Sequence, residues 1–320
     1  MLRHLLGRVL LFILGLLVTS LVIFFTLRVL PGDVTQVLGG IKATPQELET
    51  IRLAHGLDHS LASQYADWLA GLLRMNLGKS LITSAPIGDE LVSKFQVTLP
   101  LCLLALVISL SIGIPLGIVS ALRHDRHLGA VISFSAQSLA AVPALWAGLL
   151  LVVLFGKGVG IVGVLPSQGF PRDGWGQPGK AFTALLLPAL TIGIIEGAVV
   201  LRFVRSAVLE AIPQDYVRTA AAKGLTKTKA LLLHGLPNVS LAVISVIALQ
   251  TAGLITGAVL VESLFNLPGV GRMLVADVGN RDLVKVQSEV LFLTGLVLLI
   301  GLLIDLSHQL VDPRQRRLTT

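Results

Sequence analysis

Residues 213–237 read Pro-Gln-Asp-Tyr-Val-Arg-Thr-Ala-Ala-Ala-Lys-Gly-Leu-Thr-Lys-Thr-Lys-Ala-Leu-Leu-Leu-His-Gly-Leu-Pro, the longest strongly basic stretch in a very apolar chain. Asp215 indicates a helix start, because a carboxylate in the first turn interacts favourably with the helix macrodipole. The Ala-rich segment 217–223 favours a helix. Gly224 can adopt the left-handed conformation that ends it, and Thr226 can cap a following helix. We therefore predict two short helices joined at Gly224, with small side chains against which another protein can dock.

The composition indicates a polytopic, all-α membrane protein. Hydrophobic residues make up 54% of the 320 residues, charged residues only 13%, and the mean hydropathy is +0.85. A soluble domain carries about a quarter charged residues. Cys102 is the only cysteine, which excludes an internal disulfide and a cysteine-based metal site. The pI of 9.9 indicates contact with anionic lipid headgroups, and nucleic acid is not an expected partner.

Six uncharged or nearly uncharged runs are long enough to predict six membrane spans, since a span needs about 20 residues. The fourth run requires Glu196 to be tolerated in the membrane, and the sixth is short, so we expect it to extend to Asp305 or beyond. In the third run Pro143 predicts a kink that neighbouring helices absorb. We expect the first run to be a retained helix rather than a cleaved signal peptide. The runs are 9–27, 95–122, 128–156, 181–201, 235–261 and 290–304.

Positive charge predicts the orientation of these spans. With the N-terminus inside the cell, basic residues gather in the cytoplasmic loops and tail, above all in the loop 202–237. We therefore expect both termini in the cytoplasm. The expected segments are an N-terminal transmembrane helix over 1–30, an extracytoplasmic helical insert over 31–96, a five-helix core over 97–314 that contains the loop, and a tail over 315–320.

Two helices are predicted in the insert. Thr44 and Glu47 have the spacing of a capping box, which opens a helix that ends near Gly56. Ser60 can cap a second, amphipathic helix that runs through Trp68. These helices either form a cap over the outer mouth or decorate a plain loop.

Glu196 is the one acidic residue that the predicted spans clearly place inside the membrane. Because an unpaired carboxylate there is costly, Glu196 is a functional candidate that could contact a cationic group of a substrate or carry a proton. A buried hydrogen bond to a polar neighbour is the structural alternative. The sequence has no Gly-x-x-x-x-Gly-Lys-Ser/Thr motif, and its histidines lack the spacing of metal ligands. Neither an enzyme nor a metal site is expected.

The motifs of the chain resemble those of permease subunits of ATP-binding-cassette importers. The segment 215–225 is similar to the cytoplasmic loop motif of the peptide/nickel subfamily, with Leu236 and Pro237 in register. It departs from the general Glu-Ala-Ala form, because Arg218 and Thr219 precede Ala220, and His234 replaces an Ile. Four further segments resemble family elements in the expected order, so the resemblance covers nearly the whole chain: 76–80, 261–272, 281–282 and 312–314.

This resemblance implies a type I importer permease in the inner membrane, with six transmembrane helices. It implies four kinds of partner: a homologous second permease chain, two ATP-binding subunits, an extracytoplasmic binding protein and the lipid bilayer. ATP and Mg would be bound by the ATPase subunits, and no cofactor by this chain. The solute would be a peptide or a similar small molecule, a class that in this family includes nickel chelates and glutathione.

Two groups of residues are expected to carry the function. Glu196, from its place inside a span, and Glu262, in the segment 261–272 that resembles a family element, are candidates for the translocation pathway. The alternative function is a proton-coupled secondary transporter that uses Glu196, which predicts paired broken helices in two halves of the chain. The residues expected to couple the chain to the ATPase are Asp215, Tyr216, Arg218, Thr219, Ala220, Ala221, Lys223, Gly224, Leu236 and Pro237.

Overall fold

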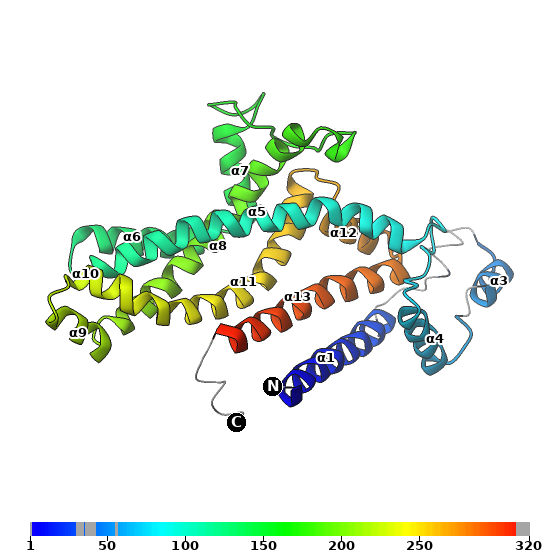
Figure 1. Cartoon of the computed structure of the whole chain (residues 1–320). Coiled ribbons are helices and arrows are strands. Elements are labelled where there is room, and N and C mark those ends of the chain that lie inside the picture. Colours follow the sequence, from blue (N-terminus) through cyan, green and yellow to red (C-terminus); the bar gives the residue numbers. More distant parts are fainter. Residues whose placement is uncertain (1, 30–34, 36–42, 55–56, 312–320) are drawn as a thin grey trace. The chain divides into compact units, whose positions relative to one another are not determined.

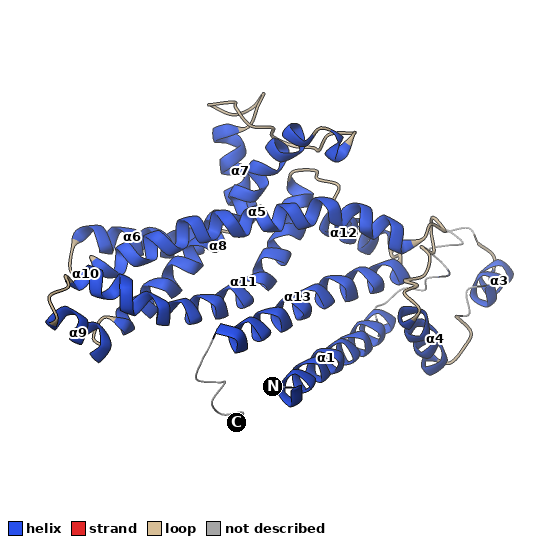
Figure 2. Ribbon diagram, viewed as in Figure 1, coloured by secondary structure: helices blue, strands red, loops and turns tan. Residues whose placement is uncertain are grey.

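A computed structural model describes the chain except for residues 1, 30–34, 36–42, 55–56 and 312–320 (Figure 1). The segment 312–314 and the predicted tail therefore lie outside the described residues. Within them, the regular elements are helices, as Figure 2 shows. The long helices are α1 (Leu2–Val29), α5 (Ile87–Leu122), α8 (Pro178–Ala211), α11 (Leu236–Leu264) and α13 (Leu283–Val311). The shorter ones are α3 (Pro45–Ala54), α4 (Leu61–Leu73), α6 (His127–Ala140), α7 (Ala144–Phe155), α9 (Asp215–Ala222), α10 (Lys227–Ala230) and α12 (Val270–Asn280), with a 3-10 turn, η1 (Gly174–Gly176), and a π turn, η2 (Leu231–Gly235).

The five long helices are each long and apolar enough to cross a membrane. The third predicted span is a pair of helices, α6 and α7, bent by 107° at the break before Ala144. The expected kink at Pro143 is therefore a complete break, because proline has no backbone N–H and disfavours a helical residue before it. The described residues hold six spans if this bent pair counts as one. The sixth span extends past Asp305 as predicted, but it also begins earlier, at Leu283.

The chain forms two compact units, and each is described by itself. The core unit comprises Thr98–Pro268 and Ile300 onward, and the insert unit comprises Leu2–Val97 and Gly269–Leu299. The expected segment boundaries stay predictions.

Helix α8 is the centre of the core unit, where it contacts α6, α7 and α11. It also packs closely against α5, at glycines of both helices. A Cβ atom at Gly113 would lie 2.8 Å from the carbonyl oxygen of Gly197, and one at Gly193 would lie 2.9 Å from that of Ala105. Only glycine permits such close backbone approach between helices in lipid. The Gly113-x-x-x-Gly117 pattern of α5 is thus a packing surface, and its counterpart on α8 is Gly193-x-x-x-Gly197.

In the insert unit, both predicted caps of the insert are confirmed. The backbone N–H of Thr44 donates to Glu47 Oε2 (2.7 Å), and the N–H of Glu47 donates to Thr44 Oγ1 (3.3 Å). The backbone N–H of Thr44 above all, and the Thr44 hydroxyl, which donates to the same oxygen (2.9 Å), hold the pKa of Glu47 below its usual value. The N–H of Ser63 donates to Ser60 Oγ (3.3 Å), which caps α4.

Aromatic side chains join α4 to the end of α1. Phe24 stacks on Trp68 with 6.1 Å between ring centroids, and the hydroxyls of Tyr65 and Ser20 share a hydrogen bond of 2.9 Å. Arg28 lies over the Phe24 ring and donates to Gln64 Oε1 (3.0 Å). Such aromatic clusters are typical of the boundary between membrane and water.

Candidate functional site

The predicted docking element is built around Gly224. Helix α9 covers Asp215–Ala222 and carries Asp215 in its first turn, as predicted. The N–H of Gly224 donates to Ala221 O (3.0 Å), and Gly224 has a φ of +96°, which is the left-handed conformation expected there. The N–H of Lys229 donates to Thr226 Oγ1 (3.3 Å), so Thr226 caps the next helix.

Helix α9 has one buried and one exposed face. Val217 and Ala220 are buried in a cluster that includes Val208 of α8, Ala121 of α5 and Leu231. The opposite face is exposed and polar apart from Tyr216 and Ala222. The exposed predicted coupling residues are Asp215, Tyr216, Arg218, Thr219, Lys223 and Gly224. Most of the predicted coupling residues thus lie on an exposed surface, whereas Ala220 is buried and packs this surface against the membrane spans.

The second predicted helix is not short. Helix α10 continues through the π turn at Leu231–Gly235 into α11, which crosses the membrane as the fifth span. The N–H of Leu236 donates to the carbonyl of Leu231, five residues back. A π turn just before Pro237 is one way to fit a residue that cannot donate a helical hydrogen bond. The docking element is therefore continuous with a membrane span, a property that the pattern of short helices did not predict.

The π turn also exposes two apolar side chains beside the buried core. Leu232 and Leu233 are 43% and 60% exposed, whereas Leu231 is 1% exposed. Leu236 is partly buried and packs against the same core cluster. An exposed leucine pair next to a basic helix is suited to contact with another protein.

Glu196 lies where α8 meets α11 in the core unit. The side-chain amide of Gln250 donates to the main-chain carbonyl oxygen of Glu196 (3.0 Å). The carboxylate lies against Gly253, where an added Cβ would be 2.6 Å from Glu196 Oε1. One turn on, a Cβ at Gly257 would be 3.3 Å from Ile192. The Gly253-x-x-x-Gly257 pattern of α11 thus packs on α8, and its first glycine accommodates the Glu196 side chain.

Glu262, the second pathway candidate, is fully buried at the end of α11. The hydroxyl of Thr98 on α5 donates to Glu262 Oε1 (2.6 Å), and the N–H of Leu267 donates to the Glu262 carbonyl oxygen (2.9 Å). A tight turn follows directly after α11, with Asn266 at a φ of +54°. Glu262 thus connects the turn that follows α11 to Thr98 of α5 through its side chain.

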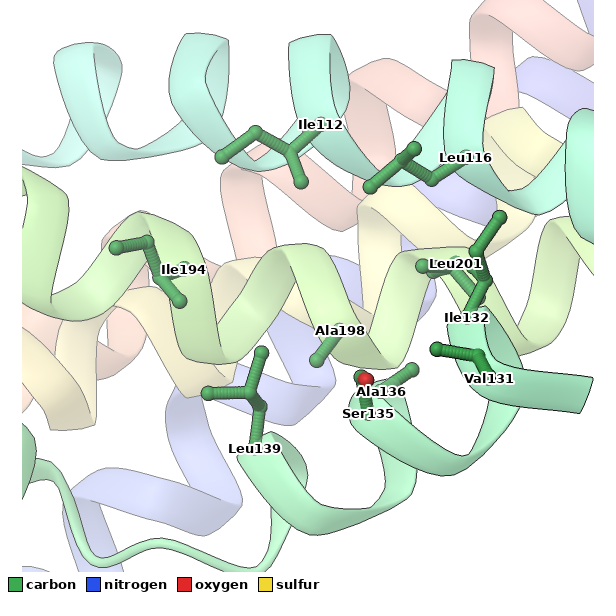
Figure 3. A pocket seen from close by; sticks show the side chains of 10 residues that line it. All are labelled: Ile112, Leu116, Val131, Ile132, Ser135, Ala136, Leu139, Ile194, Ala198 and Leu201. Carbon is green, nitrogen blue, oxygen red and sulfur yellow. The ribbon is translucent and has the colours of Figure 1, made fainter. Parts of the chain in front are cut away.

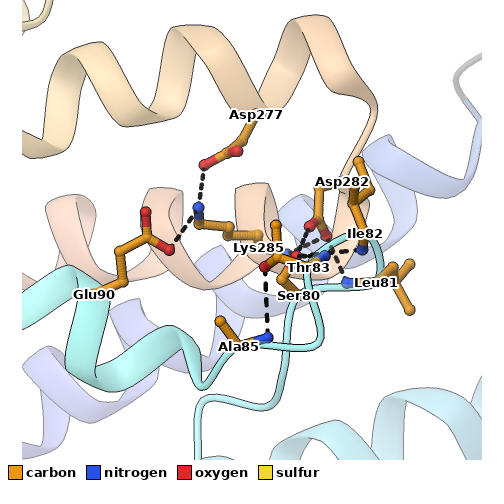
Figure 4. Close-up of polar contacts among 9 residues, drawn as sticks. All are labelled: Ser80, Leu81, Ile82, Thr83, Ala85, Glu90, Asp277, Asp282 and Lys285. Atoms are coloured by element: carbon orange, nitrogen blue, oxygen red, sulfur yellow. Dashed lines mark hydrogen bonds and ion pairs between the residues drawn. The ribbon is translucent and has the colours of Figure 1, made fainter.

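Two motifs that lie far apart in the sequence meet in the insert unit (Figure 4). The hydroxyl of Ser80, in the segment 76–80, donates to Asp282 Oδ2, although 202 positions separate the two residues. The N–H of Leu81 also donates to Asp282, and the N–H of Lys285 donates to Asp282 Oδ1, which caps α13. The hydroxyl of Ser288 donates to the carbonyl oxygen of Leu77 (3.0 Å). The start of α13 is thereby fixed to the segment before α5.

A buried ionic cluster lies beside these bonds, and the sequence did not predict it. Lys285 Nζ lies 2.9 Å from Glu90 Oε2 and 2.9 Å from Asp277 Oδ2, so one ammonium joins α5, α12 and α13 (Figure 4). Glu289, one turn after Lys285, is fully buried. The expectation that Glu196 is the one acidic residue inside a span was wrong, because α13 begins before the uncharged run and carries Lys285 and Glu289 in its first turns.

An apolar groove lies among α5, α6 and α8 in the core unit (Figure 3). Its volume is about 160 Å³, and the hydroxyl of Ser135 is the one polar side-chain group in its lining. A groove without charge or amide groups offers nothing to orient a peptide. Its lining consists of Ile112, Leu116, Val131, Ile132, Ser135, Ala136, Leu139, Ile194, Ala198 and Leu201.

Comparison with known proteins identifies the family of the chain. Residues 113–317 match the family described as binding-protein-dependent transport system inner membrane component, and residues 1–102 match the N-terminal region described for such membrane components. The chain belongs to this family. It is a multi-pass inner-membrane permease of the peptide class, and permeases of this kind are not themselves catalytic. The proton-coupled alternative is not supported.

Curated relatives align along nearly the whole chain. The dipeptide transport system permease protein of Escherichia coli (strain K12) is 33% identical over 321 residues, which cover 93% of this chain and 94% of the relative. A probable peptide ABC transporter permease of Sinorhizobium fredii is 35% identical, with 92% and 93% covered. The glutathione transport system permease protein of Escherichia coli O6:H1 is 33% identical, with 99% of each chain covered.

Proposed function

We propose that this permease takes up peptides or similar small solutes, and that residues 213–237 connect it to the ATPase subunits that power the import. The observation that carries this proposal is the structure of the loop. Its exposed face is formed by α9, its buried face is seated on α5 and α8, and its second helix continues into α11. A push on the exposed face can therefore move a membrane span as a rigid element.

The complete importer would contain a homologous second permease chain, two ATP-binding subunits and an extracytoplasmic binding protein. ATP and Mg would be held by the ATP-binding subunits. With both termini in the cytoplasm, the loop faces the ATPases, and the aromatic cluster of α1 and α4 lies at the outer boundary of the membrane. The relatives' names support a peptide-like solute, since dipeptides and glutathione share amide bonds and charged termini.

Glu196 and Glu262 have different places in this proposal. Glu262 is fully buried and bonded to Thr98, which favours a role in holding the turn after α11. Glu196 is partly exposed and lies at the α8–α11 contact beside the amide of Gln250. We propose that Glu196 is the one of the two that solute can approach, as a polar position along the pathway rather than a proton carrier.

Gly224 offers the sharpest test, because its left-handed conformation can be perturbed without a clash inside the chain. Apart from its two chain neighbours, no described residue has an atom within 4 Å of a Cβ built at Gly224, so a substitution there meets no clash within the chain and acts through the positive φ. Asn tolerates this conformation and Val does not. ATP-dependent uptake of a labelled dipeptide is measured in proteoliposomes that contain all the subunits and the binding protein.

We expect Gly224→Val to lower uptake at least about tenfold while its amount in the membrane persists, and Gly224→Asn to stay within about threefold of the unchanged protein. Equal uptake by both variants would contradict the coupling role. Uptake that is competed by a nickel chelate but not by peptides would reassign the solute and leave the coupling role intact.

The orientation is tested separately by labelling single cysteines. In a Cys102→Ser background, Ser60→Cys should react with an impermeant thiol reagent added outside the cell, and Lys229→Cys only after permeabilisation. The reverse pattern would contradict the proposed topology.

A further inference from the structure

The ionic cluster of the insert unit contains more carboxyl groups than cations. Lys285 is 5% exposed and supplies the one ammonium, whereas Glu90, Asp277 and Glu289 supply three carboxyl groups. Lys285 is bonded to Glu90 and Asp277, so it neutralises those two at most in part. The third carboxyl group, that of Glu289, has no ion pair with Lys285 among these contacts.

Glu289 is buried without a hydrogen-bond donor. Its side chain is 0% exposed, and neither of its carboxyl oxygens accepts a hydrogen bond from the described residues. The charged groups that act on it are Asp277 of α12, Glu90 of α5 and Lys285 one turn earlier on α13, with the Asp277 carboxyl within hydrogen-bonding reach. Two acceptor groups thus lie together, and none of the described residues donates a hydrogen bond to Glu289.

A proton is the smallest ligand that satisfies this arrangement. A bare carboxylate out of contact with water costs several kcal/mol, and two carboxylates that share a site cannot both stay ionised. A protonated carboxyl group gains an O–H donor. If Glu289 carries the proton, its O–H can donate to Asp277, whose Oδ2 is ion-paired with the Lys285 ammonium (2.9 Å).

We propose that Glu289 and Asp277 bind one shared proton at neutral pH, and that this proton joins α12 to α13. The proton sits on Glu289, and Asp277 stays ionised because it is paired with Lys285. The site is independent of the coupling loop and of the identity of the solute. It is a retained structural proton within the folded protein, distinct from any proton that moves with solute.

Infrared spectroscopy tests the proposal directly, because a protonated carboxylic acid has a C=O stretching band that carboxylates and amides lack. The full chain is reconstituted in lipid at neutral pH, and each variant spectrum is subtracted from that of the unchanged protein. Glu289→Gln should remove one such band, whereas Glu49→Gln, at an exposed position of α3, should remove none.

Asp277→Asn supplies an independent variant. Because it replaces the acceptor of the Glu289 O–H, it should shift the frequency of the same band rather than remove it. If Glu289→Gln fails to fold, this shift carries the test. A spectrum in which neither variant alters a carboxylic acid band at neutral pH would overturn the proposal, and Glu289 would then be ionised and bound to some other cation.

The dependence of stability on pH provides a second readout. A folded state that holds one more proton than the unfolded state loses stability as pH rises. Between about pH 5 and 8 the thermal midpoint of the unchanged protein should therefore fall relative to that of Glu289→Gln, in which no such proton exists. Parallel profiles for the two proteins would contradict the proposal.

Discussion

The docking loop and the ionic cluster hold the same kinds of charged residues in opposite ways. The loop 213–237 displays Arg218 and Lys223 on an exposed helix face, and local hydrogen bonds at Gly224 and Thr226 shape it. The cluster buries Lys285, Asp277 and Glu289, leaves the Glu90 side chain 33% exposed, and is assembled from α5, α12 and α13. Exposed charges contribute to recognition and little to stability, whereas buried ones cost much when a partner is lost. The two regions should therefore respond differently to substitution.

The largest expected effect is on stability, at Lys285. Lys285→Met removes the ammonium that pairs with Glu90 and Asp277 and leaves the buried Asp277 carboxylate without a counter-charge. We expect a loss of about 3–5 kcal/mol, seen as a lower thermal midpoint and less protein in the membrane. Lys79→Met, at an exposed lysine of the same unit, should be close to neutral. A stable Lys285→Met protein would show that the cluster does not hold the three helices together.

Two leucines of the π turn distinguish a role in the core from a role in contacting the ATPase. Leu231→Ala empties a core position that is 1% exposed and should cost about 2–5 kcal/mol. Leu233→Ala, at a position 60% exposed, should leave the thermal midpoint nearly unchanged but reduce co-purification of the ATPase subunits. If Leu233→Ala lowered stability as much as Leu231→Ala, the exposed leucine would be part of the core after all.

A smaller effect is expected at Ser80. Ser80→Ala removes the hydroxyl that donates to Asp282 and leaves the carboxylate with backbone donors only. A hydrogen bond to a charged group contributes about 1.5–3 kcal/mol, so a modest fall in thermal midpoint should follow. Ser93→Ala, at an exposed position of α5, is the matched control. Equal midpoints for the two variants would mean that the backbone donors suffice for Asp282.

The smallest effect is expected at Glu196. The Gln250 bond goes to the main-chain carbonyl of Glu196, so Glu196→Gln should preserve it and the contact with Gly253. Uptake should fall by no more than about threefold, with an unchanged dependence on pH, in the proteoliposome assay. Abolished uptake by a stable variant that still binds the ATPases would give this carboxylate an essential role in transport.

The same contrast between local and long-range contacts decides how much could be predicted from the sequence. The capping box at Thr44, the cap at Ser60 and the helix end at Gly224 each depend on residues within four positions, and all three were predicted. The Ser80–Asp282 bond depends on the tertiary fold, and no local pattern reveals it. The two segments were noticed as motifs, but nothing in their spacing shows that they touch.

The cluster escaped prediction for a different reason. The uncharged run begins at residue 290, so Lys285 and Glu289 were placed outside the sixth span, although the helix already starts at Leu283. The buried ammonium of Lys285 compensates the charge of Asp277, which allows this carboxylate to lie among otherwise apolar helices. By contrast, the α5–α8 contact has a signal in the sequence that the predictions did not use, because Gly193 and Gly197 have the four-residue spacing that lets helices approach closely.

Cross-linking tests the coupling role of the loop most directly. In a Cys102→Ser background, Thr219→Cys places one thiol on the exposed face of α9, and Thr50→Cys places one on the exposed surface of α3. Each variant is assembled with its partner subunits and treated with a short bifunctional thiol reagent. We predict an adduct between Thr219→Cys and an ATP-binding subunit whose yield changes when ATP is added, and none from Thr50→Cys. An ATP-binding subunit that cross-links to Thr50→Cys and not to Thr219→Cys would contradict the account.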